Sequence, residues 1–343
     1  MPIRRSVQAQ RTLRLAFGTA LCLGISFGLD LPIPFLAPVL ALILAMTHRP
    51  LSAKDCLKLV LVAILTTGGG LLLIPVLRYY PVCGVLLVGL GLFVAFRYGL
   101  QGGNPLVMTF LVMGLTMISS AGTADFGVAV MVIAALVQGL LLAALVLSFS
   151  HWLFPEPAGF SPPAPPPRRS AVEIGQAALR ATMIVLPTFL LALIDPAQYL
   201  PIILKAVSLG QQSSTPATRL AARELLGSTL LGGLLAVLFW CALSLFVHLW
   251  MFFLWMLLFG LLLGRRLYAM APSRQGPGFW LNTVITMIIL LGQSVQDSAA
   301  GKDVYTAFAV RMSLFILVTL YACLIIVWLD RRRFSVVNVH LDR

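Results

Sequence analysis

The chain has 343 residues, of which 60% are hydrophobic and only 10% are charged, and its mean hydropathy is +0.99. Soluble proteins carry about a quarter charged residues, so the composition excludes a soluble fold and predicts an all-α polytopic membrane protein. The formal net charge of +13 would suit nucleic acid in a soluble chain. Here its distribution indicates membrane topology instead, and we expect no nucleic-acid partner.

Twelve apolar segments are expected to form membrane helices, because a helix needs roughly 17–25 residues to cross a bilayer. Several are short or contain proline, and broken helices at matching places indicate a transport site. The first half of the chain holds the segments 12–29, 31–47, 55–77, 82–98, 104–120 and 126–150. The second half holds the segments 173–194, 197–212, 221–247, 250–265, 278–296 and 304–329.

The chain therefore divides into two six-helix transmembrane repeats, predicted at residues 1–150 and 173–330. Between them lies a proline-rich linker at 151–172, which contains FPEPAGFSPPAPPPRRS and is expected to be extended. Residues 331–343 form a basic tail.

The basic residues predict the orientation of the helices. With the N-terminus in the cytoplasm, 20 of the 24 lysines and arginines fall on the cytoplasmic side. The exceptions are Arg78, Lys302 and Arg311 on the outer side and Lys205 within the membrane. The positive-inside rule therefore predicts that both termini and the linker are cytoplasmic.

The two halves resemble each other. The stretch LRLAFGTALCLGISFGLDLPIPFLAPVLALILA from Leu13 is similar to LRATMIVLPTFLLALIDPAQYLPIILKAVSLGQ from Leu179, and VAILTTGGGLLL (62–73) is similar to RELLGSTLLGGLLA (223–236). Six segments return the chain to the same side, so we expect parallel repeats related by a pseudo-twofold axis along the membrane normal. The shared landmarks are an arginine that begins the first helix and an aspartate that ends it: Arg14 and Asp30, Arg180 and Asp195.

Glycines recur in the third segment of each half and in GxxxG spacing elsewhere. Small residues allow helix backbones to approach closely, so packing is one interpretation of these glycines. The other is that the third helices cross near the pseudo-twofold axis and shape a pathway. The glycines concerned are Gly68, Gly69, Gly70, Gly232 and Gly233, with the pairs Gly24 and Gly28, and Gly260 and Gly264.

Three stretches carry a resemblance to a known family. They are the basic first helix RTLRLAFGTALCL, the basic turn LAMTHRP and the run TRLAARELLGSTLLGGLLA. Together they resemble the fusaric acid resistance and aromatic acid exporter family of bacterial inner-membrane proteins over nearly the whole chain. In the last run, an Arg–Gly–Thr–Gly pattern matches at Arg223, Gly227, Thr229 and Gly232.

The resemblance implies proton-driven efflux of small organic anions or aromatic acids across the inner membrane, with membrane lipid around the chain and a periplasmic adaptor as partner. Many members of this family carry a large cytoplasmic domain between the halves. This chain lacks it and has only the proline-rich linker there.

No sequence pattern predicts an enzyme. The four histidines are far apart and none shows HExxH spacing, and neither GxSxG nor a P-loop pattern occurs. The five cysteines include no CxxC pair, so we expect neither a disulfide framework nor a metal site, and no cofactor.

Lys205 is the candidate ligand for a substrate carboxylate. A lysine at the centre of a membrane helix costs about 2.5–3.5 kcal/mol on insertion scales, so it usually faces a cavity or a partner. The alternative is that its side chain snorkels to the interface. Pro201 and the following GQQSST favour an irregular helix that lines a wet cleft. Gln211, Gln212 and Ser213 are then candidate hydrogen-bond donors on its cytoplasmic side.

Two further charged residues are candidates. Arg223 begins the glycine-rich third segment of the second half, where it is either an interfacial anchor or a cation at the cytoplasmic mouth that gathers anions. Asp297 lies near the outer end of segment 278–296, where it is either solvated by the loop or takes up a proton from the periplasm.

Three functions therefore stay open from the sequence. The first is a proton-driven exporter of organic anions or aromatic acids. The second is a passive anion channel of the same duplicated fold, and the third is a membrane assembly subunit without transport of its own.

Overall fold

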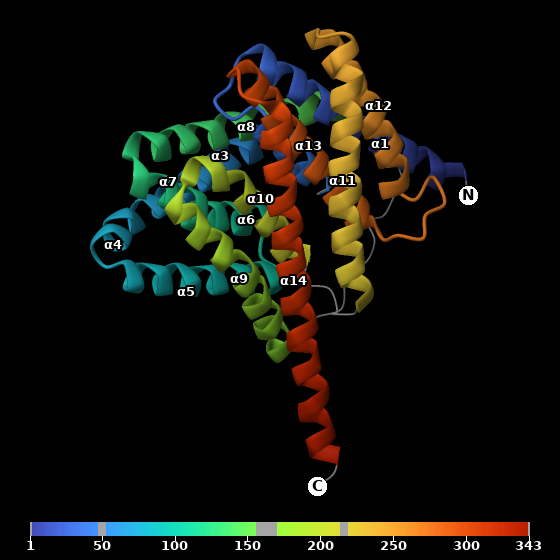
Figure 1. Ribbon diagram of the computed structural model, residues 1–343. Coiled ribbons are helices and arrows are strands. Elements are labelled where there is room, and N and C mark those ends of the chain that lie inside the picture. The colour runs from blue at the N-terminus through green and yellow to red at the C-terminus, as the bar shows by residue number, and fades with distance from the viewer. Residues whose placement is uncertain (1, 47–52, 156–169, 213–218, 342–343) are drawn as a thin grey trace. The chain divides into compact units, whose positions relative to one another are not determined.

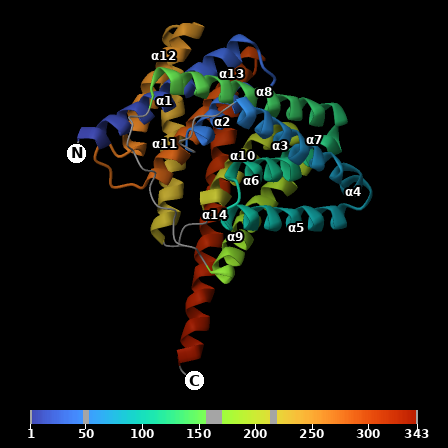
Figure 2. The same ribbon diagram turned by 180° about the vertical axis from the view of Figure 1, so that it is seen from behind.

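The computed structural model describes residues 2–46, 53–155, 170–212 and 219–341 (Figures 1 and 2). All regular elements within these ranges are helices, and none is a strand. The helices are α1 (Pro2–Gly28), α2 (Leu36–Ala45), α3 (Ala53–Leu71), α4 (Leu73–Tyr79), α5 (Pro81–Leu100), α6 (Pro105–Met113), the π-helix η1 (Gly114–Ile118), α7 (Ser119–Ala124), α8 (Phe126–Leu153), α9 (Ala171–Ile194), α10 (Pro196–Gln212), α11 (Arg219–Leu245), α12 (Leu249–Leu267), α13 (Pro277–Ala299) and α14 (Val304–Leu341).

The expected segments correspond to these helices in order, and the all-α class is confirmed. The third expected segment is α3 continued by α4, and the fifth is α6, η1 and α7 end to end. Nine helical stretches of the described chain are long and apolar enough to cross a membrane.

The second segment differs from the expectation. Helix α2 begins at Leu36 rather than at residue 31, because Asp30 turns the chain with a φ of 49° and two prolines follow at Pro32 and Pro34. Its 10 residues give a length of about 15 Å, which is about half of the hydrocarbon thickness. Helix α2 by itself is therefore shorter than a full membrane span.

Prolines and polar caps determine where several helices begin. Proline lies in the first turn of α5, α6 and α13, where its missing N–H costs no helical hydrogen bond. Asn104 caps α6 by accepting from the Leu106 amide at 3.0 Å. A capping box begins α9, in which the Ser170 hydroxyl accepts from the Glu173 amide and the Glu173 carboxylate from the Ser170 amide.

The chain folds into two compact units that do not follow chain order. Unit 1 comprises Met1–Leu65, Met131–Arg168 and Leu231–Ala309, and unit 2 comprises Thr66–Val130, Arg169–Leu230 and Val310–Arg343. Each unit therefore takes segments from both halves of the sequence. The four helices divided between the units are α3, α8, α11 and α14, which are the third and sixth segments of each half.

Within unit 1, α1 packs along α12 and α2 contacts both α1 and α13 (Figures 1 and 2). Gly260 of α12 lies against α1 so closely that a β-carbon there would be 3.0 Å from the Ala16 Cα. In the part of α11 that belongs to unit 1, a β-carbon on Gly232 would be 2.8 Å from the Thr283 carbonyl oxygen of α13. Glycines thus bring helix backbones together at two contacts of this unit.

Within unit 2, α5 packs along α9, and α9 packs along α10. A β-carbon on Gly70 at the end of α3 would overlap the carbonyl oxygen of Gly114 in η1. By contrast, Gly68 and Gly69 have open space where a β-carbon would be. The packing interpretation of the glycine triad is therefore confirmed for Gly70 alone.

The internal contacts of the two units correspond. In each unit, the first segment of one half packs along the fourth segment of the other half, as α1 with α12 and α9 with α5. The glycine of a third segment also meets a fifth segment in each unit, as Gly232 with α13 and Gly70 with η1. This correspondence supports the duplication, and the pseudo-twofold relation itself stays a prediction.

Candidate functional site

Lys205 lies in α10 of unit 2, and its side chain is 0% exposed. Helix α10 packs on α9 and also contacts α6, η1 and α7 of the same unit. Pro201 lies inside the helix and removes one intrahelical hydrogen bond. Ser208 and Gln212 are three and seven residues after Lys205, so at 3.6 residues per turn the three lie on one face of α10.

The two predicted glutamines have acceptors that the sequence did not indicate. Gln211 donates from Nε2 to the Thr109 hydroxyl of α6 at 2.9 Å, and Gln212 donates to the Ser208 hydroxyl at 3.2 Å. Gln211 is displaced by about 120° from Lys205 around the helix and connects α10 to α6. Ser213 lies outside the described residues.

A π-helical turn lies beside α10 and was not expected from the sequence. It interrupts the span Pro105–Ala124 at η1, and both Thr116 within η1 and Ser119 directly after it are fully buried. Their hydroxyls donate to carbonyls of their own helix, at 2.6 Å to Val112 and 2.5 Å to Leu115. π-Helical turns are rare and frequently occur at functional sites. The cluster of small and hydroxyl residues in GLTMISSAG is the sequence signal that accompanies it.

The arginines of the repeated motif are buried in both units. Arg14 of α1 in unit 1 is 4% exposed, and Arg180 of α9 in unit 2 is 5% exposed. Arg223, the other candidate arginine, is exposed at the beginning of α11. The two arginines of the repeated motif are therefore interior cations, whereas Arg223 is at the surface.

Asp297 lies near the outer end of its helix, as expected, but it is not solvated there. Helix α13 continues to Ala299, and Asp297 is 4% exposed within unit 1. Loop solvation is therefore wrong as an account of Asp297. Its backbone carbonyl also accepts from the Lys302 amide at 2.9 Å, which closes the turn after the helix.

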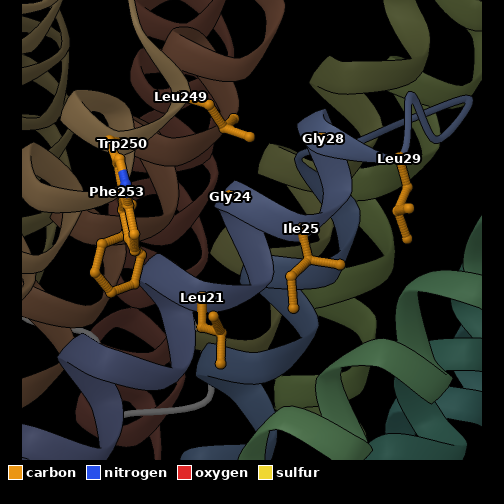
Figure 3. Close-up of a pocket in the computed structure, with 8 residues that line it drawn as sticks. All are labelled: Leu21, Gly24, Ile25, Gly28, Leu29, Leu249, Trp250 and Phe253. Carbon is orange, nitrogen blue, oxygen red and sulfur yellow. The ribbon is translucent and has the colours of Figure 1, made fainter.

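An apolar recess lies between α1 and α12 in unit 1 (Figure 3). Its volume is about 490 Å³, within the range of small-molecule sites. It exists partly because Gly24 and Gly28 present no side chain, with Phe253 and Leu249 opposite them. No charged residue lines it; the lining residues are Leu21, Gly24, Ile25, Gly28, Leu29, Leu249, Trp250 and Phe253.

The part of the chain with described side chains contains no group of three or more His, Cys, Asp and Glu residues that could hold a metal ion. The cysteines of this part are all free thiols.

These helices, with charged residues buried among them, define an all-α multi-pass membrane protein. Residues 11–149 match the family described as a protein of unknown function (DUF2955), which is nearly the whole first predicted repeat. Comparison of the chain with curated proteins and with solved structures gives no match.

Proposed function

We propose that the protein exports small organic anions, among them aromatic acids, across the bacterial inner membrane and is driven by the proton gradient. The observation that carries this proposal is the complete burial of Lys205 in a chain that spans the membrane several times. Keeping a lysine in such an interior is costly, and intramembrane cations of this kind mark substrate pathways or pair with a partner. A carboxylate is the substrate group that an ammonium recognises.

Asp297 supports proton coupling over a passive channel. It is an acidic side chain buried in unit 1, while Lys205 is a basic side chain buried in unit 2. A passive anion channel needs the cation but has no use for a buried carboxylate. An exporter that exchanges protons for anions uses both charges. The resemblance to aromatic acid exporters supports the same substrate class.

The short loops support a requirement for an adaptor protein. In the proposed orientation, the outer side carries the connections after α1, α4, α7, α9, α11 and α13, and the longest comprises residues 29–35. Such loops leave almost no mass outside the membrane. The chain therefore delivers its substrate to the periplasm, and a periplasmic adaptor that docks on these loops carries it further.

The test is flux of benzoate, the simplest aromatic carboxylate, from proteoliposomes that contain the full chain. Lys205→Met is expected to lower flux about tenfold to hundredfold, because one charge-assisted hydrogen bond is lost. Lys58→Met removes an exposed lysine and serves as the matched control with unchanged flux.

Three results would overturn the proposal or parts of it. Wild-type flux in a correctly inserted Lys205→Met protein would show that the anion site is elsewhere. Equal flux with and without a pH gradient would identify a passive channel. No flux under any condition, but recovery of the chain with partner proteins, would identify an assembly subunit.

A further inference from the structure

Helix α13 carries a polar stripe through the interior of unit 1. Asn282, Thr286, Gln293 and Asp297 lie within about 60° of arc at 3.6 residues per turn. Their exposed fractions are 0%, 0%, 5% and 4%. From the first to the last residue the stripe is about 22 Å long, which is most of the hydrocarbon thickness of a bilayer. Only Ile289, which is also buried, interrupts it on this face.

The stripe differs in chemistry from the corresponding fifth segment of the first half. There the buried polar residues are all hydroxyls, and each donates to a carbonyl of its own helix: Thr109, Thr116, Ser119 and Ser120. Hydroxyls satisfied in this way need no water. In α13 the stripe adds two amides and a carboxylate, which are too polar for a helix backbone to satisfy by itself.

Gln293 is the residue that supports hydration of the stripe. Its Oε1 atom is buried and has no hydrogen-bond partner among the residues that the structure describes. A buried carboxamide oxygen without a partner costs about 1–3 kcal/mol, and such groups in native proteins are generally satisfied by an ordered water. Asp297 lies one helical turn away on the same face, so a water bound at Gln293 would be next to a carboxylate.

We infer that the polar face of α13 borders a water-filled track that admits protons and small cations and excludes anions. A hydronium ion at the outer end gives its proton to the Asp297 carboxylate and leaves water behind. Release of that proton to water restores the carboxylate. The track thus supplies the proton that drives export, and this role rests on the proposed function. The hydration of the track is independent of the proposed function.

The experiment measures the reaction of single cysteines with water-soluble methanethiosulfonates in the full chain. Peptide masses identify the modified residue, so the native cysteines can stay in place. Gln293→Cys and Thr286→Cys place the thiol on the stripe, and Leu291→Cys places it at a similar depth on the opposite, equally buried face. We expect reaction on the stripe to be about tenfold faster than at the control, because only a hydrated thiol forms the reactive thiolate.

The charge of the reagent tests the selectivity of the track. A cationic ethylammonium reagent is expected to react several times faster than an anionic ethylsulfonate reagent of similar size, and Asp297→Asn is expected to remove this difference. Labelling at neither stripe position, or equal labelling at the control, would overturn the inference. Faster labelling by the anion would assign the track to the exported substrate instead. None of these readings requires transport, so they stand whether or not benzoate flux is observed.

Discussion

Gly69 and Gly70 are neighbours in the sequence, but only Gly69 has room for a methyl group. A β-carbon on Gly70 overlaps the carbonyl oxygen of Gly114, whereas one on Gly69 meets open space. Backbone atoms cannot move aside as the end of a flexible side chain can. The two neighbours in a single glycine run therefore have opposite sensitivities.

We expect Gly70→Ala to destabilise the protein by about 1–3 kcal/mol, as overpacking does, and to lower its melting temperature in detergent. Gly69→Ala is the matched control and is expected to be neutral or slightly stabilising, because alanine is the better helix former. Equal melting temperatures for the two variants would show that α3 and η1 do not pack as described.

The contact between helices α1 and α12 shows the same difference between a tight and an open glycine position. At Gly260 a β-carbon would lie 3.0 Å from the Ala16 Cα, but at Gly24 the nearest atom, the Phe253 Cβ, is 3.8 Å away. Gly260 therefore packs directly against the backbone of α1, whereas Gly24 borders the recess of Figure 3. One helix pair thus has a rigid part and a part with room.

We expect Gly260→Leu to separate α1 from α12 and to lower the yield of folded protein. Gly24→Leu is expected to fill the recess with little loss of stability, because the added atoms enter empty apolar volume. Thermal unfolding monitored by size-exclusion chromatography compares the two. A larger loss for Gly24→Leu than for Gly260→Leu would contradict the packing.

Helix α14 begins at a cap that responds to pH. The Thr306 hydroxyl donates to the Asp303 carboxylate, and the Tyr305 amide donates to it at 3.1 Å. The hydrogen bond from the Thr306 hydroxyl is the main reason that the pKa of Asp303 is below its ordinary value, and the hydrogen bonds from the Tyr305 and Thr306 amides add to it. A lowered pKa means that the cap is fully present above the usual aspartate range and is lost as pH falls through the folded pKa.

Asp303→Ala is therefore expected to speed hydrogen exchange at the Tyr305 and Thr306 amides at neutral pH. Asp303→Asn keeps an acceptor oxygen and is expected to show a smaller effect. Acidification below the ordinary range of aspartate should make the wild-type protein resemble the alanine variant. Exchange that is unchanged in Asp303→Ala would show that another group caps α14.

Two features concern the whole molecule: the distribution of arginines along the chain, and the exchange of segments between the two units. The first predicts cytoplasmic termini and a cytoplasmic linker. In the second, each unit contains the first two segments of one half and the fourth and fifth segments of the other. A duplicated chain whose halves have equivalent helices accounts for both.

The topology is tested by a cysteine placed in the linker at Ser161, which lies outside the described residues. An impermeant thiol reagent added to intact cells is expected to leave this cysteine unlabelled and to label it after the cells are opened. Cys83, exposed in the first turn of α5, lies near the outer side in the proposed orientation and is the positive control. Labelling of the linker in intact cells would reverse the orientation.

The duplication is tested by an experimental structure of the full chain. Residues 12–150 are expected to superpose on residues 173–329 by a rotation of roughly 180° about the membrane normal. The corresponding contacts, α1 with α12 and α9 with α5, should coincide after this rotation. Halves of opposite topology would contradict the duplication.

Composition and segment length predict the class of the protein and the order of its helices. A bilayer requires about 20 consecutive apolar residues, so composition and segment length were enough to predict helices such as α5, α8 and α12 within a few residues. The sequence also singled out Lys205, because a lysine inside an apolar run is conspicuous without any structure. Its prolines marked where α2 is irregular but not how short that helix is.

Burial and close approach depend on which helix faces meet, and these cannot be predicted from the sequence. Nothing local distinguishes a loop-end aspartate from the buried Asp297, or Gly70 from Gly69, because burial and close approach depend on residues far away in the chain. The recess beside Gly24 and the exchange of segments between units depend on the same long-range packing. In an almost wholly apolar sequence every helix face is a plausible interface, so hydrophobic pattern alone cannot choose among them.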